Sequence, residues 1–272
     1  MSALLMRETD RLERRVLGAI EFLDATTRTR VDTPLDVRMD GARLLRNRRG
    51  LYVITHAEHP LLALHADAFE TAPVQPVLGS VAFMLLVDDR SGRYLPRSVA
   101  VTLPRDPAPA NAGSPASLFR PIEVPLYPAA TAPVGLNWSV LRVAVRDSTS
   151  GDALGGVLLI VTSGGNTLAR GLSDWRGEAL VAVPGVPVTT WSETPAAVTV
   201  NEINAQIEGV FPGSGGTRIS AAQLRSGRAP LALPQIDPEV VESQRAALPR
   251  SAQAVTLATG RSQSLSLVLA LP

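Results

Sequence analysis

The chain has 272 residues, no cysteine, and 26 basic against 25 acidic residues, which leaves a formal net charge of +1. A charge this close to zero argues against nucleic acid or an anionic membrane as the main partner, and the lack of cysteine excludes disulfides, thiolate metal sites and thiol nucleophiles. Every basic residue is an arginine, which fits either a GC-rich genome or selection for bidentate contacts at interfaces.

Residues 1–18 place leucine and valine among arginine and glutamate, a pattern typical of a short amphipathic helix or arm. This segment lacks a basic stretch followed by an uninterrupted apolar run, and no apolar run in the chain is long enough to span a bilayer. We therefore expect cytoplasmic synthesis without a signal peptide and no membrane insertion. Export would then occur only as part of an extracellular or virion-like particle.

Residues 19–130 predict a first β-sandwich, because short apolar or alternating runs are separated by Asp, Thr, Gly and Pro. The clearest element is a hairpin over 80–104, in which Gly92 can take the positive φ that such a turn needs. A last strand follows at 122–128, where Pro125 indicates a sheet edge or a bulge.

A second β-sandwich is expected from 138–212 together with 252–272, since the alternating run SLSLVLAL returns near the end of the chain. Residues 213–251 interrupt it as an extension or insertion. Within the extension, Asp237 and Pro238 predict the N-cap and first residue of a short helix. The fold class is thus all-β: two tandem antiparallel β-sandwich domains with a short N-terminal helix and an extended C-terminal segment.

The chain also contains an internal repeat, in which AIEFLDATTRTRV is echoed by LRVAVRDSTSGDAL. The matched positions are Asp24 with Asp147, Thr26 with Thr149, and Gly50 with Gly177. Asp and Thr side chains bond nearby backbone amides in tight turns, and Gly supplies left-handed backbone positions. The repeat therefore predicts a scaffold built twice rather than an active site built twice.

The second copy resembles the carboxypeptidase-regulatory-like, transthyretin-like family of small antiparallel β-sandwiches. The resemblance rests on Asp147, on the Thr149 and Gly151 turn, and on Ser173, Asp174 and Gly177, with Ser173 standing where the family more often has Thr. It covers the second domain well and the first only loosely. Because the fold hosts no shared chemistry, the resemblance implies a binding or spacer module.

The order of the parts is similar to that in proteins of phage tails and phage-tail-like contractile particles. The residues that carry this likeness are 92–96, which read GRYLP, and 121–128, which read PIEVPLYP. It implies a structural subunit of such a particle.

Three histidines, His56, His59 and His65, lie within ten residues of one another. Clustered imidazoles are candidate metal ligands, but this spacing fits neither a His-Glu-x-x-His helix nor a zinc finger. We expect exposed loop residues here, with a metal site as the alternative.

Arg43, Arg46, Arg48 and Arg49 form a basic cluster, for which a solvated turn or a protein–protein salt-bridge patch is favoured over phosphate binding, because the net charge is near zero and no aromatic residue lies among them. Trp175 and Trp191 are ligand or interface candidates: exposed tryptophans suggest sugar stacking, and buried ones suggest anchors of a core or interface. Asp88 and Asp89 are interpreted as turn formers. The sequence contains neither a lysine for a phosphate loop nor a Gly-x-Ser-x-Gly elbow.

These observations favour a non-catalytic structural or adaptor subunit of a large assembly, plausibly a phage-tail-like contractile particle. Its partners would be other protein subunits, including copies of itself, with no cofactor and no nucleic acid. The alternative is a glycan- or cell-surface-binding β-sandwich module. An enzyme has no positive support in the sequence.

Overall fold

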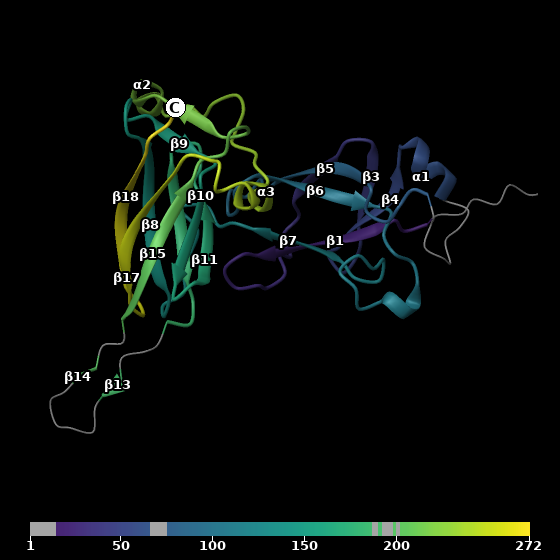
Figure 1. Ribbon diagram of the computed structural model, residues 1–272, viewed down its shortest axis with the longest axis horizontal. Coiled ribbons are helices and arrows are strands. Elements are labelled where there is room, and N and C mark those ends of the chain that lie inside the picture. The colour runs from purple at the N-terminus through teal and green to yellow at the C-terminus, as the bar shows by residue number, and fades with distance from the viewer. Residues whose placement is uncertain (1–14, 66–74, 187–189, 192–197, 200–201) are drawn as a thin grey trace, which may run out of the picture. The chain divides into compact units, whose positions relative to one another are not determined.

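A computed structural model describes residues 15–65, 75–186, 190–191, 198–199 and 202–272. The fold is an all-β sandwich, as predicted, with few and short helices among the described residues (Figure 1). The helix expected in residues 1–18 falls almost entirely outside the described part of the chain.

Two sheets are formed by the first seven strands. One has the order β3-β4-β1-β7 and contains β1 (Gly18–Asp24), β3 (Ala42–Arg46), β4 (Tyr52–Ala57) and β7 (Ile122–Leu126). The other has the order β2-β5-β6 and contains β2 (Asp36–Met39), β5 (Val81–Asp88) and β6 (Arg97–Leu103). The expected hairpin is confirmed as β5 and β6, and Pro125 lies on β7 at the edge of its sheet, where a missing N–H is tolerated. Short helices α1 (Pro60–His65) and η1 (Pro109–Asn111) complete this part.

The remaining strands form two further sheets. One has the order β11-β10-β15-β17, from β10 (Leu158–Ser163), β11 (Asn166–Leu172), β15 (Ile203–Val210) and β17 (Arg250–Leu257). The other contains β8 (Ser139–Asp147), β9 (Ala153–Gly155), β12 (Glu178–Val183), β16 (Thr217–Ile219) and β18 (Ser262–Leu269). The final strand returns as predicted, but β18 pairs with β8 in parallel. A separate pair joins β13 (Thr190–Trp191) and β14 (Val198–Thr199).

The core of this second sandwich lies between its two sheets. Alternate residues of β8, namely Leu141, Val143 and Val145, pack with Leu159 of β10 and Val181 of β12. Each is at most 3% exposed, so each contributes roughly 1.5–3 kcal/mol of burial free energy. Leucine and valine fill this layer because the two-residue period of a strand directs every second side chain inward.

Residues 213–251 cover the other face of β10. They form β16, α2 (Ala221–Ser226) and α3 (Pro238–Ser243), and Ile236 and Val241 pack with Leu158 and Ile160. This cover explains why β10 is a continuous apolar run rather than an alternating one, since both of its faces are buried. The predicted cap is confirmed, because the Asp237 side chain accepts a hydrogen bond from the Glu239 amide and Pro238 begins α3.

The contacts divide the chain into two compact units. The first comprises Met1–Ile20, Gly41–Phe83 and Thr102–Ile122, and the second comprises Glu21–Asp40, Met84–Val101 and Glu123–Pro272. These units are defined by contacts in space, and their limits are not those of the predicted domains 19–130 and 138–212 plus 252–272. The predicted domains were defined from the sequence pattern and remain a prediction.

The internal repeat extends to strand register. Aligning Asp24 with Asp147 and Gly50 with Gly177 places β1 on β8 and β4 on β12. In the first copy Gly18 pairs with Ile54 and Ile20 with Tyr52. The aligned residues pair in the second copy, Leu141 with Val181 and Val143 with Ala179. The two copies therefore share the same antiparallel register, which the sequence alone did not establish.

Two further pairings follow the same alignment. The bridge between Leu23 and Arg30 corresponds to the pairing of Arg146 with Ala153. The Ala25 amide donates to the Leu126 carbonyl at 2.9 Å, and the aligned Ser148 amide donates to the Leu269 carbonyl at 2.8 Å. One pair of corresponding strands, β3 in the first copy and β11 in the second, has different neighbours. β3 pairs with β4, whereas β11 pairs with β10. The copies thus share their arrangement around β1 and β8 apart from that strand.

Candidate functional site

The matched aspartates build the same turn. Asp24 Oδ1 accepts hydrogen bonds from the Thr26 and Thr27 amides at 2.8 and 2.9 Å. The Asp147 carboxylate accepts from the Thr149 and Ser150 amides at 3.4 and 3.2 Å. The residue after each pair has positive φ, 60° at Arg28 and 73° at Gly151. The expectation that these residues are turn chemistry is confirmed.

A second type of turn occurs three times. Asn47 Oδ1 accepts from the amides of Arg49 and Leu51, and Asp174 Oδ1 accepts from those of Arg176 and Glu178. The glycines inside these turns, Gly50 and Gly177, have φ of 82° and 74°. The third turn is that of Asp89, which accepts from Ser91 and Arg93 around Gly92. Asp89 is thus a turn former, as predicted.

The remaining oxygen of Asp24 is bonded to a tyrosine. Tyr94 Oη donates to Asp24 Oδ2 at 2.9 Å, and both side chains are buried. Burial, together with this bond to a carboxylate, raises the pKa of Tyr94 to about 12. The first turn is therefore tied to the β5–β6 connection by a buried neutral hydroxyl.

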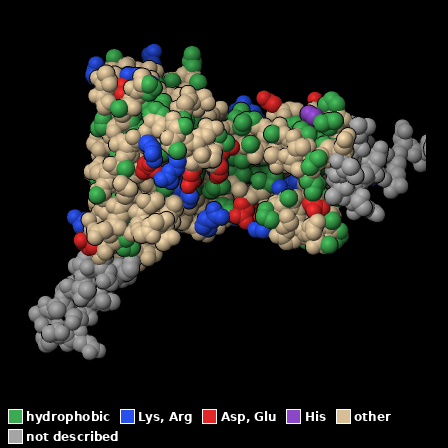
Figure 2. Space-filling model, in the orientation of Figure 1, with side chains coloured by type: hydrophobic (Ala, Val, Ile, Leu, Met, Phe, Trp, Pro, Cys, Tyr) green, Lys and Arg blue, Asp and Glu red, His purple; other side chains and the backbone are tan. Residues whose placement is uncertain are grey.

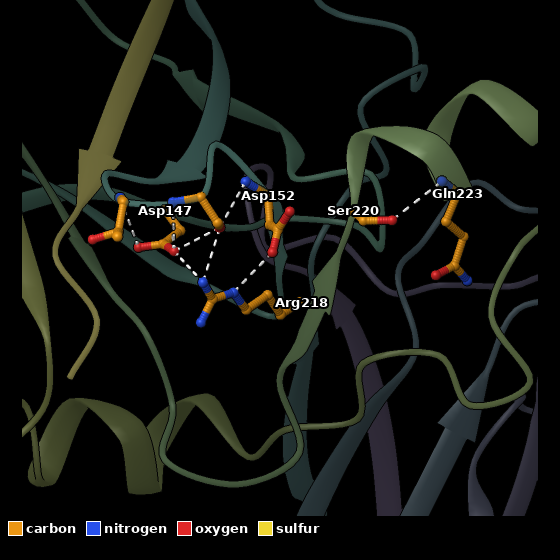
Figure 3. A network of polar contacts seen from close by, with 7 residues as sticks. Asp147, Asp152, Arg218, Ser220 and Gln223 are labelled. Atoms are coloured by element: carbon orange, nitrogen blue, oxygen red, sulfur yellow. Dashed lines mark hydrogen bonds and ion pairs between the residues drawn. The ribbon is translucent and has the colours of Figure 1, made fainter.

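The corresponding oxygen of Asp147 is bonded to an arginine of the extension (Figure 3). Arg218 of β16 donates from one nitrogen to Asp147 and from Nε to Asp152 at 3.0 Å. Hydrogen bonds from the Ser150 hydroxyl and from nearby amides, with the Arg218 charge, lower the pKa of Asp147. Figure 3 also shows Ser220, which accepts from the Gln223 amide and caps α2.

A buried arginine holds α3 against the first strands of the second unit. Arg97 of β6 is 1% exposed and forms ion pairs with Glu239 and, at 3.7 Å, with Asp237. It donates to the Pro125 carbonyl at 2.6 Å, and its guanidinium lies 5.8 Å from the Tyr127 ring centroid. Burial raises the pKa of Glu239 despite the opposing Arg97 charge. A buried, fully paired arginine of this kind is structural.

A pocket that opens to solvent lies beside Trp175 and has a volume of about 290 Å³. All of its lining residues belong to the second unit. The turns of Asp89 and Asp174 form two of its walls, and the extension forms a third through Leu233 and Pro234. Trp175 is half-buried, and the Arg176 guanidinium lies 5.9 Å from its ring centroid.

Most polar groups of the Trp175 pocket are already bonded. Asp89 and Asp174 hold their turns, and Tyr94 donates to Asp24. Asp88, half-buried at the end of β5, forms no hydrogen bond or ion pair through its side chain with the residues that the structure describes. A carboxylate, an indole ring and apolar walls are therefore the groups that the pocket offers to a ligand.

The expectation of three exposed loop histidines is corrected, because one lies on a strand, one is half-buried and one ends a helix. His56 is exposed on β4, with its Nε2 4.0 Å from Glu58, whereas His59 is half-buried with its ring edge-on to Phe83. His65 ends α1, and its side chain lies outside the described residues. Within the described part, no three histidine, aspartate or glutamate side chains gather as metal ligands.

The other candidates are divided between surface and pocket. Arg46, Arg48 and Arg49 are exposed at the connection of β3 to β4. Trp191 lies in β13, but its side chain is outside the described residues. Trp175, in contrast, lines the pocket. Trp175 was thus the one ligand candidate that lines the pocket, whereas Asp88, Asp89 and Asp174 had been named only as turn residues, and sequence reasoning identified neither Arg97 nor Arg218.

Charges of both signs lie beside one another on the face shown in Figure 2. Ion pairs among the described residues include Arg170 with Glu242 at 2.8 Å and Arg250 with Glu208 at 3.2 Å. None of the described helices is both long and apolar enough to cross a membrane.

No protein-family model matches the chain, and no curated protein matches it. Among solved structures, one similar chain is that of BcpA, the major pilin subunit of Bacillus cereus, with 9% sequence identity and a TM-score of 0.23. The match covers 95% of this chain and 60% of the pilin chain, so this protein spans 60% of the pilin's length. At this level of similarity the pilin carries no argument about the function of this chain.

Proposed function

We propose that the protein is a non-catalytic structural or adaptor subunit of a larger protein assembly. The observation that carries this proposal is the use of the repeated carboxylates. The carboxylate oxygens of Asp24, Asp147 and Asp174 accept hydrogen bonds from backbone amides and from fixed side chains of the same chain. Carboxylates held in this way stabilise loops, whereas a catalytic acid or base needs an oxygen within reach of a substrate.

The finer form of the proposal is a carboxypeptidase-regulatory-like sandwich, present in two related copies, in a phage-tail-like contractile particle. The shared register of the copies supports a module that was duplicated as a spacer. Exposed apolar side chains supply contact surface for neighbours, among them Leu231, Leu136 and Leu45 at 111%, 94% and 63% of full exposure.

Purification under gentle lysis from the native cells tests this function. A carboxyl-terminal tag should recover the chain in a multi-subunit complex, with partners identified by mass spectrometry and the complex visible by electron microscopy. Recovery of the chain alone, with no partner at any cross-linking strength, would count against an assembly role. Tail sheath or tube proteins among the partners would support the finer form.

A second candidate, a glycan-binding module, is favoured by one observation: the half-buried Trp175 lines an open pocket whose wall also contains the Asp88 carboxylate. Indole rings commonly stack on sugar rings while their N–H finds a polar partner. Binding on a glycan array that is lost in Trp175→Ala would support this candidate, and an array without any bound sugar would remove it.

A further inference from the structure

We propose that the pocket beside Trp175 receives the arginine-bearing turn Arg46–Arg49 of a second copy of this chain. This inference rests on the proposed assembly function and names one of its contacts. It joins two surfaces that the chain carries separately: an acidic, aromatic pocket and a basic turn.

The pocket has an excess of negative charge. Its wall contains three aspartates, Asp88, Asp89 and Asp174, against a single guanidinium, Arg176. Asp89 and Asp174 accept hydrogen bonds in their turns, and Arg176 pairs with Asp174 at 2.7 Å. Asp88 forms no hydrogen bond or ion pair through its side chain with the described residues, although it lies in the field of Arg90, and it is half-buried, where a charge is screened less than at the open surface. A cationic ligand would compensate for it.

The rest of the wall suits an arginine side chain in particular. Trp175 presents half-buried aromatic surface, on which a guanidinium stacks more favourably than an ammonium does, as Arg176 of the same chain does at 5.9 Å from the ring centroid. Leu95, Leu233 and Pro234 supply apolar surface for the aliphatic stem. The volume of about 290 Å³ admits an arginine side chain, and the rest of the turn would lie at the open mouth of the pocket.

The arginine turn has the complementary character. Arg46, Arg48 and Arg49 are exposed, and no acidic residue occurs from Ala42 to Tyr52. Arg48 forms no hydrogen bond or ion pair that involves the described residues, and Leu45 beside it is 63% exposed. Leu45 could therefore pack against Leu233, which is 39% exposed at the pocket.

The turn is also held in one conformation before it binds. Asn47 Oδ1 accepts from the Arg49 and Leu51 amides at 2.9 and 3.0 Å, and the Gly50 amide donates to the Asn47 carbonyl at 3.0 Å. Because the backbone is already ordered, less conformational entropy is lost on docking. A contact between two different surfaces of identical chains is heterologous, and it generates rings or open chains of subunits.

Sedimentation velocity of the purified full chain tests the contact. The wild type should form species larger than a dimer as its concentration rises. Asp88→Arg and Arg48→Glu should each weaken self-association by on the order of tenfold or more, since each places like charges together. Asp40→Arg and Arg225→Glu, which make the same charge changes at exposed residues outside the pocket and the turn, should associate as the wild type does.

Mixing the two variants gives the sharpest readout. Asp88→Arg retains an intact turn and Arg48→Glu retains an intact pocket, and the two reversed charges also have opposite signs, so the equimolar mixture should regain the self-association that each variant alone has lost. Circular dichroism checks that each variant is folded, and Asp88→Asn provides a milder second pocket variant. Wild-type protein that stays monomeric at every concentration, or variants that associate normally, would overturn the contact.

Further outcomes separate this inference from the proposed function. A glycan that binds at Trp175 without any loss of self-association would assign the pocket to sugar and overturn the inference. If the native complex is recovered but both variants enter it normally, the contact is wrong and the assembly function stands. A chain recovered alone from native cells refutes the assembly function itself.

Discussion

The turn at Asp24 and the turn at Asp147 are the same backbone structure with different tethers. In each, one aspartate accepts two local amides and a left-handed residue closes the loop. The first is tied by the buried Tyr94 hydroxyl and the second by the partly exposed Arg218 guanidinium. The hydrogen bonds within the turn are therefore the same in both copies, whereas the distant residue that bonds to the aspartate differs.

The largest effect is expected from removing the buried tether. Asp24→Ala leaves the Tyr94 hydroxyl and two amides without their acceptor, which should lower the free energy of unfolding by about 3 kcal/mol. Urea denaturation followed by circular dichroism measures the loss. Asp147→Ala should cost less, because the Arg218 side chain is 42% exposed and can turn to water. A larger loss for Asp147→Ala would reverse the comparison.

The tyrosine partner allows a direct check of that tether. Tyr94→Phe removes the donor instead of the acceptor, so the double variant with Asp24→Ala should lose less stability than the two single losses added together. Strict additivity in this cycle would mean that the Tyr94 to Asp24 bond does not link the two residues in solution.

A smaller and local effect is expected at the second turn. Arg218→Gln removes a partly exposed guanidinium from the buried Asp147 carboxylate, which keeps the hydrogen bonds of its turn, and should lower the free energy of unfolding by about 1–2 kcal/mol. Because Arg218 lies on β16, which pairs with β9, amide hydrogen exchange should accelerate over 217–219 and 153–155. Exchange in β1 and β4 serves as the internal control and should not change; equal acceleration there would contradict a local tether.

Acid should separate the two turns further. The pKa of Asp147 is below its ordinary value of 3.8 in the folded chain. Its contribution to stability is thus complete above that value and is lost as pH falls through the folded pKa. The stability difference between the wild type and Asp147→Asn should shrink as the pH falls from about 5 to about 2. A difference that grows with acidity would show that the carboxylate is not stabilised by folding.

The smallest effect is expected in alkali. Tyr94 and Tyr127 both have a pKa of about 12 in the folded chain, chiefly because they are buried. Since these values lie above the ordinary 10.0, the stabilisation that they provide is present below about pH 10 and is lost as pH rises toward 12. Ultraviolet titration should show delayed ionisation of Tyr94 and Tyr127. Ionisation of both near pH 10 in folded protein would contradict their burial.

The parts of the fold that the sequence predicted are those set by neighbouring residues. The Asp24 and Asp147 turns, the Gly92 hairpin and the Asp237 cap depend on partners within a few positions, so their residue types identify them. The strands followed from alternation of apolar residues.

What could not be predicted depends on partners far apart in the chain. Arg97 and Glu239 are separated by 142 residues, and Arg218 and Asp147 by 71. The parallel pairing of β18 with β8 is likewise a matter of topology, since alternation does not give strand direction. The pocket was found only in part, because Trp175 stood out as a rare aromatic while Asp88 looked like any turn residue.

The proposed role as a subunit of a larger assembly is tested most directly by the mass of the complex that contains this chain in gently lysed native cells. We expect a multi-subunit particle, many times heavier than the 28.7 kDa chain. A single species of 28.7 kDa at every protein concentration would contradict it.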